Sequence, residues 1–203
     1  MADKTALKNL ALVVGARPNF IKAAPLLRAL KEYRDSIRPI LIHTGQHFDR
    51  YLFEILFRDL DLPEPDIDLK IGSETPIGQT AAIMVGLERE FQKNKPDLVV
   101  VFGDVTSTLA AAVAAAKMNI PIAHIEAGLR SFDTRMPEEI NRKLTDHMAV
   151  YHFISESSGR KNLVNEGLSE KSLYLVGNIM IDSLEYHRAQ IEASLVLERL
   201  NLT

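Results

Sequence analysis

The chain has 203 residues, enough for one domain and too few for two domains of ordinary size. Apolar residues make up 46% and charged residues 25%, and the net charge of −3 leaves no basic surplus for binding a nucleic-acid backbone. The absence of cysteine excludes disulfides, a thiolate nucleophile, iron–sulfur clusters and cysteine-bearing zinc sites.

No apolar run approaches the length of a membrane-spanning helix. The longest runs, such as 98–102 and 110–116, fall well short of the roughly 20 residues required. The N-terminal segment leads only into a short apolar stretch bounded by Gly15 and Arg17, which is not typical of a signal peptide. We therefore expect a cytoplasmic protein with no membrane partner and no nucleic-acid partner.

Short apolar runs alternate with longer segments of helical periodicity. Most of the strong strand candidates are almost wholly apolar, as expected of parallel strands covered on both faces. The pattern predicts an α/β fold with a Rossmann-like parallel sheet, right-handed crossovers and helices on both faces. In chain order, we predict strands at 10–14, 38–43, 66–69 (weaker), 98–102, 122–125, 152–154 and 173–176, and helices at 21–32, 49–59, 78–94, 107–119, 138–149 and 157–166.

The last part of the chain reads differently from the rest. Residues 1–178 contain all the alternating elements, whereas 179–202 reads as one long helix with no strand after it. The sequence therefore predicts a lobe over 1–178 and a helical segment over 179–203.

Polar residues follow the strands at their carboxyl ends. They occur at 15–22, 44–47, 103–108 and 126–130, directly after four of the predicted strands. Ligands bind outside the carboxyl ends of the strands in open parallel sheets. The pattern therefore predicts a site for a polar ligand at this edge.

The first of these segments, 15–22, contains one glycine and matches neither the dinucleotide fingerprint nor the P-loop. Pro18 suits the first turn of a helix. Arg17 can bind a phosphate or carboxylate with its planar guanidinium, although it can also be a solvated arginine near a helix start.

Acidic residues are the candidates for acid–base chemistry. Asp104 can alternatively cap the following helix, and Glu126 can alternatively form a salt bridge with Arg130 or Arg142. Glu138 lies in a first helical turn, where an acid is also favoured by the helix dipole. Three acids at one edge are more than caps require, and carboxylates that crowd together raise one another's pKa toward neutrality.

Two histidine-containing pairs raise the question of a metal. His43 and His47 are four residues apart, and His124 and Glu126 are two apart. Neither pair has a third ligand at an obvious spacing, so we predict no metal site.

Six segments, in this order and spacing, resemble the UDP-N-acetylglucosamine 2-epimerase family. They cover nearly the whole chain and are 15–25 (GARPNFIKAAP), 44–47 (TGQH), 103–108 (GDVTST), 124–130 (HIEAGLR), 137–142 (PEEINR) and 177–182 (GNIMID).

The resemblance implies a two-lobed fold like that of the B-type glycosyltransferases, with the active site between the lobes. This chain would supply the first lobe, and 179–203 would begin the crossover towards a missing C-terminal lobe. The resemblance also implies a homodimer that uses the first lobe, a UDP-sugar substrate, and neither a metal nor another cofactor.

The family reaction interconverts UDP-N-acetylglucosamine and UDP-N-acetylmannosamine through elimination and re-addition of UDP. By motif match, the resemblance implies that Asp104, Glu126 and Glu138 are the acid–base residues. The neighbouring Glu139 is expected to matter less.

The resemblance also assigns substrate-binding residues. Arg17 and Lys22 would steady the diphosphate or the carboxylate cluster. Gln46, His47 and Arg142 would contact the substrate.

Other functions remain open. A hydrolysing epimerase or a B-type glycosyltransferase lobe would share much of the pattern, although the pair Gln46 and His47 resembles the non-hydrolysing branch. A receiver-like binding module would need paired acids after its first strand, where this chain has Gly-Ala-Arg-Pro at 15–18.

Overall fold

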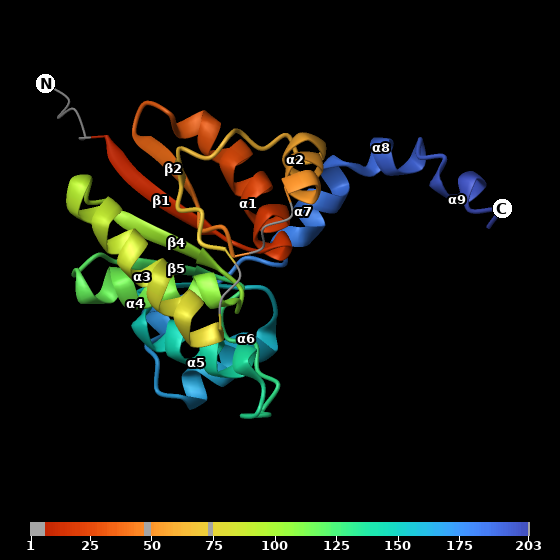
Figure 1. Ribbon diagram of the computed structural model, residues 1–203. Coiled ribbons are helices and arrows are strands. Elements are labelled where there is room, and N and C mark those ends of the chain that lie inside the picture. The colour runs from red at the N-terminus through yellow and green to blue at the C-terminus, as the bar shows by residue number, and fades with distance from the viewer. Residues whose placement is uncertain (1–6, 47–49, 73–74, 203) are drawn as a thin grey trace, which may run out of the picture.

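The computed structural model describes residues 7–46, 50–72 and 75–202 and contains one parallel sheet in the order β3-β2-β1-β4-β5-β6-β7 (Figure 1). Every pairing in it is parallel, so all the strands end at the same edge. This confirms the expected α/β class. The strands are β1 Lys8–Val14, β2 Ile37–His43, β3 Ile67–Asp68, β4 Leu98–Phe102, β5 Ile122–Ile125, β6 Tyr151–Ile154 and β7 Leu173–Leu175.

Helices cover both faces of the sheet (Figure 1). On one side, α1, α2 and α7 pack on a core that includes Leu12, Phe20 and Phe102. On the other, α3 and α4 pack on a second core that includes Val13 and Ile83, and α6 adds a small cluster. The helices are α1 Arg17–Leu30, α2 Arg50–Asp59, α3 Pro76–Lys93, α4 Thr106–Lys117, α5 Pro137–Met148, α6 Ser157–Asn165, α7 Ile179–Tyr186, α8 Arg188–Glu192 and α9 Val196–Arg199, with short 3₁₀ turns at Lys31–Tyr33 and Glu170–Ser172.

Helix α1 begins four residues before the expected start at 21. Pro18 lies in its first turn as expected, because a proline there loses no helical hydrogen bond. The Asn19 side chain accepts hydrogen bonds from the N–H groups of Gly15 and Ala16, at 3.1 and 3.2 Å. Pro25 lies in the interior of this helix.

The prediction of one long helix over 179–202 is wrong. The segment forms α7, α8 and α9, which are interrupted at His187 and at Ala193–Leu195. Only α7 packs against α1, and α8 and α9 extend away from the sheet with exposed side chains (Figure 1). A helix in water needs more than about 12 residues or a packing partner to be stable, so this segment breaks where the lobe ends.

The division at residue 178 stays a prediction. Asn178 caps α7, because its side chain accepts a hydrogen bond from the N–H of Met180 at 3.0 Å. Since α7 packs on α1, the part of the chain that projects from the lobe begins after Tyr186. Among the described residues, no helix combines the length and the apolar character that crossing a membrane requires.

Candidate active site

The loops at the carboxyl edge of the sheet meet around Gly15, just after β1. A Cβ built at Gly15 would overlap the hydroxyl oxygens of Ser107 and Thr44 and lie 2.8 Å from the Ser107 Cβ. The hydroxyls of Thr44 and Ser107 are themselves hydrogen-bonded at 2.8 Å. The ends of β1 and β2 and the start of α4 therefore approach closely because residue 15 has no side chain.

Lys22 and Glu126 form an ion pair across this edge. Lys22 lies on α1 and is 5% exposed, and its ammonium contacts a carboxylate oxygen of Glu126, which follows β5. The Glu126 backbone has a φ of 71°, a strained conformation for a residue other than glycine. Because Glu126 pairs with Lys22, while Arg130 and Arg142 pair with other acids, the alternative pairing of Glu126 with either arginine is wrong.

Gly103 leaves the space for this ion pair. Its φ is 60°, and a Cβ there would lie 2.9 Å from the Lys22 Nζ and 3.1 Å from the Glu126 Oε2. The turn after β4 therefore needs glycine for two reasons, its backbone conformation and the closeness of the pair.

Asp104 follows Gly103 and pairs with Arg142 of α5. The Arg142 guanidinium lies 2.5 Å from the Asp104 carboxylate, and the Asn141 side chain donates to the Asp104 carbonyl oxygen at 2.7 Å. The N-cap of α4 is Val105 rather than Asp104, so the capping alternative for Asp104 is wrong. Asp104 and Glu126 each contact a cation, so the negative charge of both acids is balanced at this edge.

The two adjacent glutamates of α5 lie in different surroundings. Glu138 is exposed and makes no hydrogen bond or ion pair with the described residues. Glu139 is fully buried and accepts hydrogen bonds from the N–H groups of Ser131 and Phe132 at 2.9 and 3.2 Å, and from Arg142 at 3.1 Å. Burial opposes the charged form of Glu139, but these hydrogen bonds prevail and lower its pKa to about 2. Glu139 therefore anchors the 131–132 loop and is unsuitable as an inert control for Glu138.

The remaining predicted binding residues are placed as follows. Arg17 is exposed at the start of α1 and makes no hydrogen bond or ion pair with the described residues. The Gln46 side-chain oxygen accepts from the N–H and the hydroxyl of Ser107, at 3.0 and 2.6 Å, and so caps α4. His47 lies outside the described residues.

A buried charged network behind these loops was not foreseen. The Asp146 carboxylate of α5 lies 2.7 Å from the His124 Nδ1 and 2.7 Å from the Arg130 guanidinium, and all three side chains are fully buried. Burial alone would raise the pKa of Asp146, but the adjacent His124 and Arg130 hold it below its usual value. Arg130 also binds Glu166 through two hydrogen bonds, at 2.8 and 2.7 Å. The available signal was a histidine in an otherwise apolar strand, because a buried ring nitrogen needs a polar partner.

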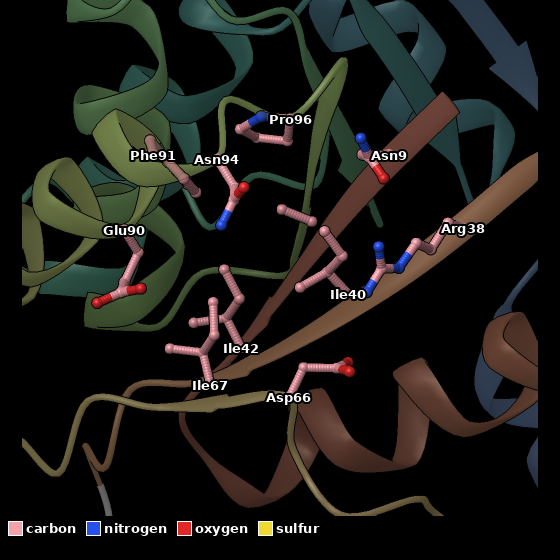
Figure 2. Close-up of a pocket in the computed structure, with 11 residues that line it drawn as sticks. Asn9, Arg38, Ile40, Ile42, Asp66, Ile67, Glu90, Phe91, Asn94 and Pro96 are labelled. Atoms are coloured by element: carbon pink, nitrogen blue, oxygen red, sulfur yellow. The ribbon is translucent and has the colours of Figure 1, made fainter. Parts of the chain in front are cut away.

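No group of three metal-ligating side chains occurs in the part of the chain that the structure describes. A separate cavity of about 420 Å³ lies away from the candidate site, between the sheet and the C-terminal part of α3 (Figure 2). It is lined by residues such as Asn9, Arg38 and Asn94 and by none of the predicted site residues. The candidate site is therefore the carboxyl edge of the sheet rather than this cavity.

Comparison with known proteins gives the family. A family model described as UDP-N-acetylglucosamine 2-epimerase matches residues 28–202. The UDP-N-acetylglucosamine 2-epimerase of Methanocaldococcus jannaschii is 44% identical over 175 residues, which are 86% of this chain and 47% of that protein. The UDP-2,3-diacetamido-2,3-dideoxy-D-glucuronate 2-epimerase of Pseudomonas aeruginosa is 46% identical over 173 residues, which are 84% of this chain and 49% of that protein.

Comparison with solved structures indicates the same family. The crystal structure of the M. jannaschii UDP-GlcNAc 2-epimerase in complex with UDP-GlcNAc and UDP superposes with a TM-score of 0.89 at 41% identity, over 95% of this chain and 52% of that chain. The fold expectation, the first lobe of a glycosyltransferase-B-like architecture, is confirmed. The chain spans about half the length of the relatives it matches. On the family match and these identities, the chain belongs to the UDP-N-acetylglucosamine 2-epimerase family.

Proposed function

We propose that this chain, joined to a second lobe, interconverts UDP-N-acetylglucosamine and UDP-N-acetylmannosamine by inverting C2 of the sugar. The observation that carries the proposal is the pair of cation-bound acids, Glu126 with Lys22 and Asp104 with Arg142, at the carboxyl edge of the sheet. The names of the relatives and the UDP-GlcNAc and UDP bound in one of the similar structures support it.

The reaction requires a base, an acid and stabilisation of a leaving diphosphate. A base takes the C2 proton, the C–H electron pair forms a C1=C2 double bond, and the C1–O bond breaks with its electrons leaving on UDP. Returning UDP adds to C1 while an acid delivers a proton to the opposite face of C2. Both half-reactions benefit from carboxylates fixed beside the sugar and cations beside the diphosphate.

The placement of the residues supports the following roles. Glu126 and Asp104, each held by a cation, are the acid–base pair beside C2, and the exposed Glu138 is the third candidate. The Arg17 side chain is exposed and makes no hydrogen bond or ion pair with the described residues, so its guanidinium is available for the diphosphate. Gln46 keeps only its amide nitrogen for substrate, because its oxygen caps α4.

The experiment measures epimerisation by the chain joined to a second lobe. That lobe comes from the sequence downstream of Thr203 or, where the gene ends there, from the M. jannaschii relative. Glu126→Gln and Asp104→Asn should each lower kcat at least about 100-fold, the scale of losing a general acid or base, with smaller effects on KM.

The matched control is Asp97→Asn. Asp97 precedes β4 and pairs with Lys8 at 3.1 Å, whereas Asp104 follows the same strand at its other end. The control should keep the kcat of the parent. An unaltered kcat for Glu126→Gln would remove the acid–base assignment, and an inactive parent would contradict the proposed function.

The Pseudomonas relative favours a second substrate for the same chemistry. Its name gives a UDP-diacetamido-dideoxyglucuronate as the sugar nucleotide, at an identity close to that of the M. jannaschii enzyme. Both sugar nucleotides should be assayed with the same protein, and a higher kcat/KM for the uronate would reassign the substrate. Release of free sugar and UDP would identify a hydrolysing enzyme.

We also infer a homodimer that forms through the first lobe. The alanine-rich α4 offers little surface for contact between subunits, because its alanines 110–112, 114 and 115 are at most 6% exposed. Helix α3 instead exposes Ala81 and Val85. Val85→Asp should therefore lower the mass measured by light scattering at tens of micromolar from dimer to monomer, and a monomeric parent would contradict the inference.

A further inference from the structure

His124 connects two acceptors that belong to different parts of the candidate site. Its Nε2 lies 2.7 Å from the carbonyl oxygen of Gly103, and its Nδ1 lies 2.7 Å from the Asp146 carboxylate. Neither a carbonyl oxygen nor a carboxylate donates a hydrogen bond, so both contacts are made only when the ring donates from both nitrogens. The imidazole ring is fully buried, and its two hydrogen bonds fix its orientation.

These contacts fix the turn that presents Asp104. The Gly103 N–H donates to the Ile125 carbonyl at 2.9 Å, and the Gly103 carbonyl accepts from His124. Both main-chain polar groups of Gly103 are thus bound to residues of β5. Asp104 is the next residue, so the direction of its Cα–Cβ bond follows from the orientation of the turn.

Asp146 holds the second acidic loop as well. Its other carboxylate oxygen accepts from the N–H of Gly128 at 3.2 Å and contacts Arg130 at 2.7 Å. Gly128 lies two residues after Glu126. One carboxylate therefore supports both the loop that carries Glu126 and, through His124, the turn that carries Asp104.

We propose that His124, held by Asp146, is a positioning residue for the epimerisation site. By binding the Gly103 carbonyl, it places Asp104 against Arg142 and beside the Lys22–Glu126 pair. This role rests on the proposed function, because it concerns the acids assigned to the chemistry there.

His152 provides a matched control on the neighbouring strand. It lies opposite His124 in the β5–β6 register and is 1% exposed. Its Nε2 lies 2.8 Å from the main-chain oxygen of Asp146, and its Nδ1 lies 3.3 Å from that of Ser172. It has similar burial and two similar acceptors, but neither acceptor precedes a candidate acid.

The test compares two amides in place of His124, in the same two-lobed protein as above. The amide nitrogen of His124→Gln reaches the position of Nε2 and keeps the bond to Gly103. The amide of His124→Asn reaches only the position of Nδ1, so it keeps Asp146 and loses Gly103. We expect His124→Asn to lower kcat about 100-fold with KM little changed, the scale of misplacing a catalytic group by about 1 Å.

His124→Gln should retain at least about ten times the kcat of His124→Asn, because the Gly103 bond is kept. His152→Asn should lower the melting temperature as much as His124→Asn and leave kcat unchanged. Equal kcat values for His124→Gln and His124→Asn, or equal losses for His124→Asn and His152→Asn, would overturn the proposal.

A second measurement separates this proposal from the proposed function. If the parent protein does not epimerise, amide hydrogen exchange at residues 103–105 tests the positioning role. Faster exchange in His124→Asn than in His152→Asn supports that role, and equal exchange overturns it.

If His124→Asn does not fold, Asp146→Asn replaces it. A kcat loss of at least about tenfold at unchanged KM supports the role, and an unchanged kcat overturns it.

Discussion

Gly103 is constrained both by its positive φ and by its closeness to the Lys22–Glu126 pair, and the two effects can be measured separately. Gly103→Ala introduces the strain of a positive φ, about 1–2 kcal/mol, and a methyl group that displaces Lys22 from Glu126. We expect its loss in free energy of unfolding, measured by urea denaturation, to exceed the strain alone by about 1 kcal/mol or more.

Gly167→Ala is the control for this comparison. Gly167 has a φ of 87°, and nothing lies within 4 Å of the position of its Cβ, so the alanine there introduces strain without crowding. Equal losses for the two variants would show that Lys22 and Glu126 adapt to the methyl group at no cost.

Protonation of the buried Glu139 at low pH should lower the folding stability of the lobe. Its pKa is about 2 in the folded protein against an ordinary value of 4.5, so the folded state favours the ionised form. The resulting stability is fully present above pH 4.5 and is lost as the pH falls from 4.5 towards 2. We expect the melting temperature of Glu139→Gln to be lower than that of the parent at pH 6 and to change less between pH 4.5 and pH 3.

Glu64→Gln is the comparison for this profile. Glu64 is exposed and makes no hydrogen bond or ion pair with the described residues, so the variant should keep the pH profile of the parent. An identical slope in Glu139→Gln and Glu64→Gln would contradict the assignment to Glu139.

The sequence predicted well which residues lie at the carboxyl edge of the sheet. It predicted poorly which residues they form ion pairs and hydrogen bonds with. Asp104 and Glu126 were placed correctly at the carboxyl edge, because residues that end parallel strands share that edge. The partner of Glu126 is Lys22, 104 positions away, and pairing at that separation depends on packing that no local pattern reports. The partners of His124 were missed for the same reason, since its acceptors come from the turn after the neighbouring strand β4 and from α5.

At the scale of elements, α7 and the two helices after it differ in what they contribute. Tyr186 of α7 stacks on the Arg28 guanidinium, 3.4 Å from its ring centroid, and Ser183 is buried, whereas the side chains of α8 and α9 are not. Removing residues 188–203 should change the free energy of unfolding by less than about 0.5 kcal/mol, because exposed residues contribute little.

Removing residues 179–203 should cost more than about 2 kcal/mol, because it also uncovers the apolar face of α1 and leaves Arg28 without its aromatic partner. Urea denaturation of the two truncated chains measures the difference. Equal stabilities would show that α7 does not stabilise the lobe.

Sequence periodicity predicted element types well and some boundaries poorly. The parallel strands were found because burial on both faces makes them continuous apolar runs. The start of α1 was missed because Ala16, at the N-cap, is not a capping residue. Asn19, the third residue of the helix, reaches back to the N–H groups of Gly15 and Ala16, as the third helical residue of a capping box does. The break after Tyr186 was missed because helical periodicity does not report whether anything packs on the helix.

At the scale of the whole molecule, we expect the 203-residue chain to fold on its own without catalysing the reaction. The sheet is covered on both faces, and each face has its own apolar core, so the chain should fold alone. The relatives are about twice as long as this chain, and we expect the proposed chemistry to need contacts to UDP from a second lobe. We expect a cooperative thermal melt and no detectable epimerisation from the 203-residue chain, and turnover by this chain alone would contradict the expectation.

Gly15 has a consequence for how this protein can change over generations. A glycine codon leads by any single base substitution either to another glycine codon, to a stop codon, or to a residue with at least a Cβ. Every such amino-acid replacement would overlap the Thr44 and Ser107 hydroxyls and force apart loops from three segments of the chain. Variation at this position is therefore blocked by neighbouring atoms, and a path to alanine would open only after both neighbours had lost those atoms, as in Ser107→Gly together with Thr44→Ala.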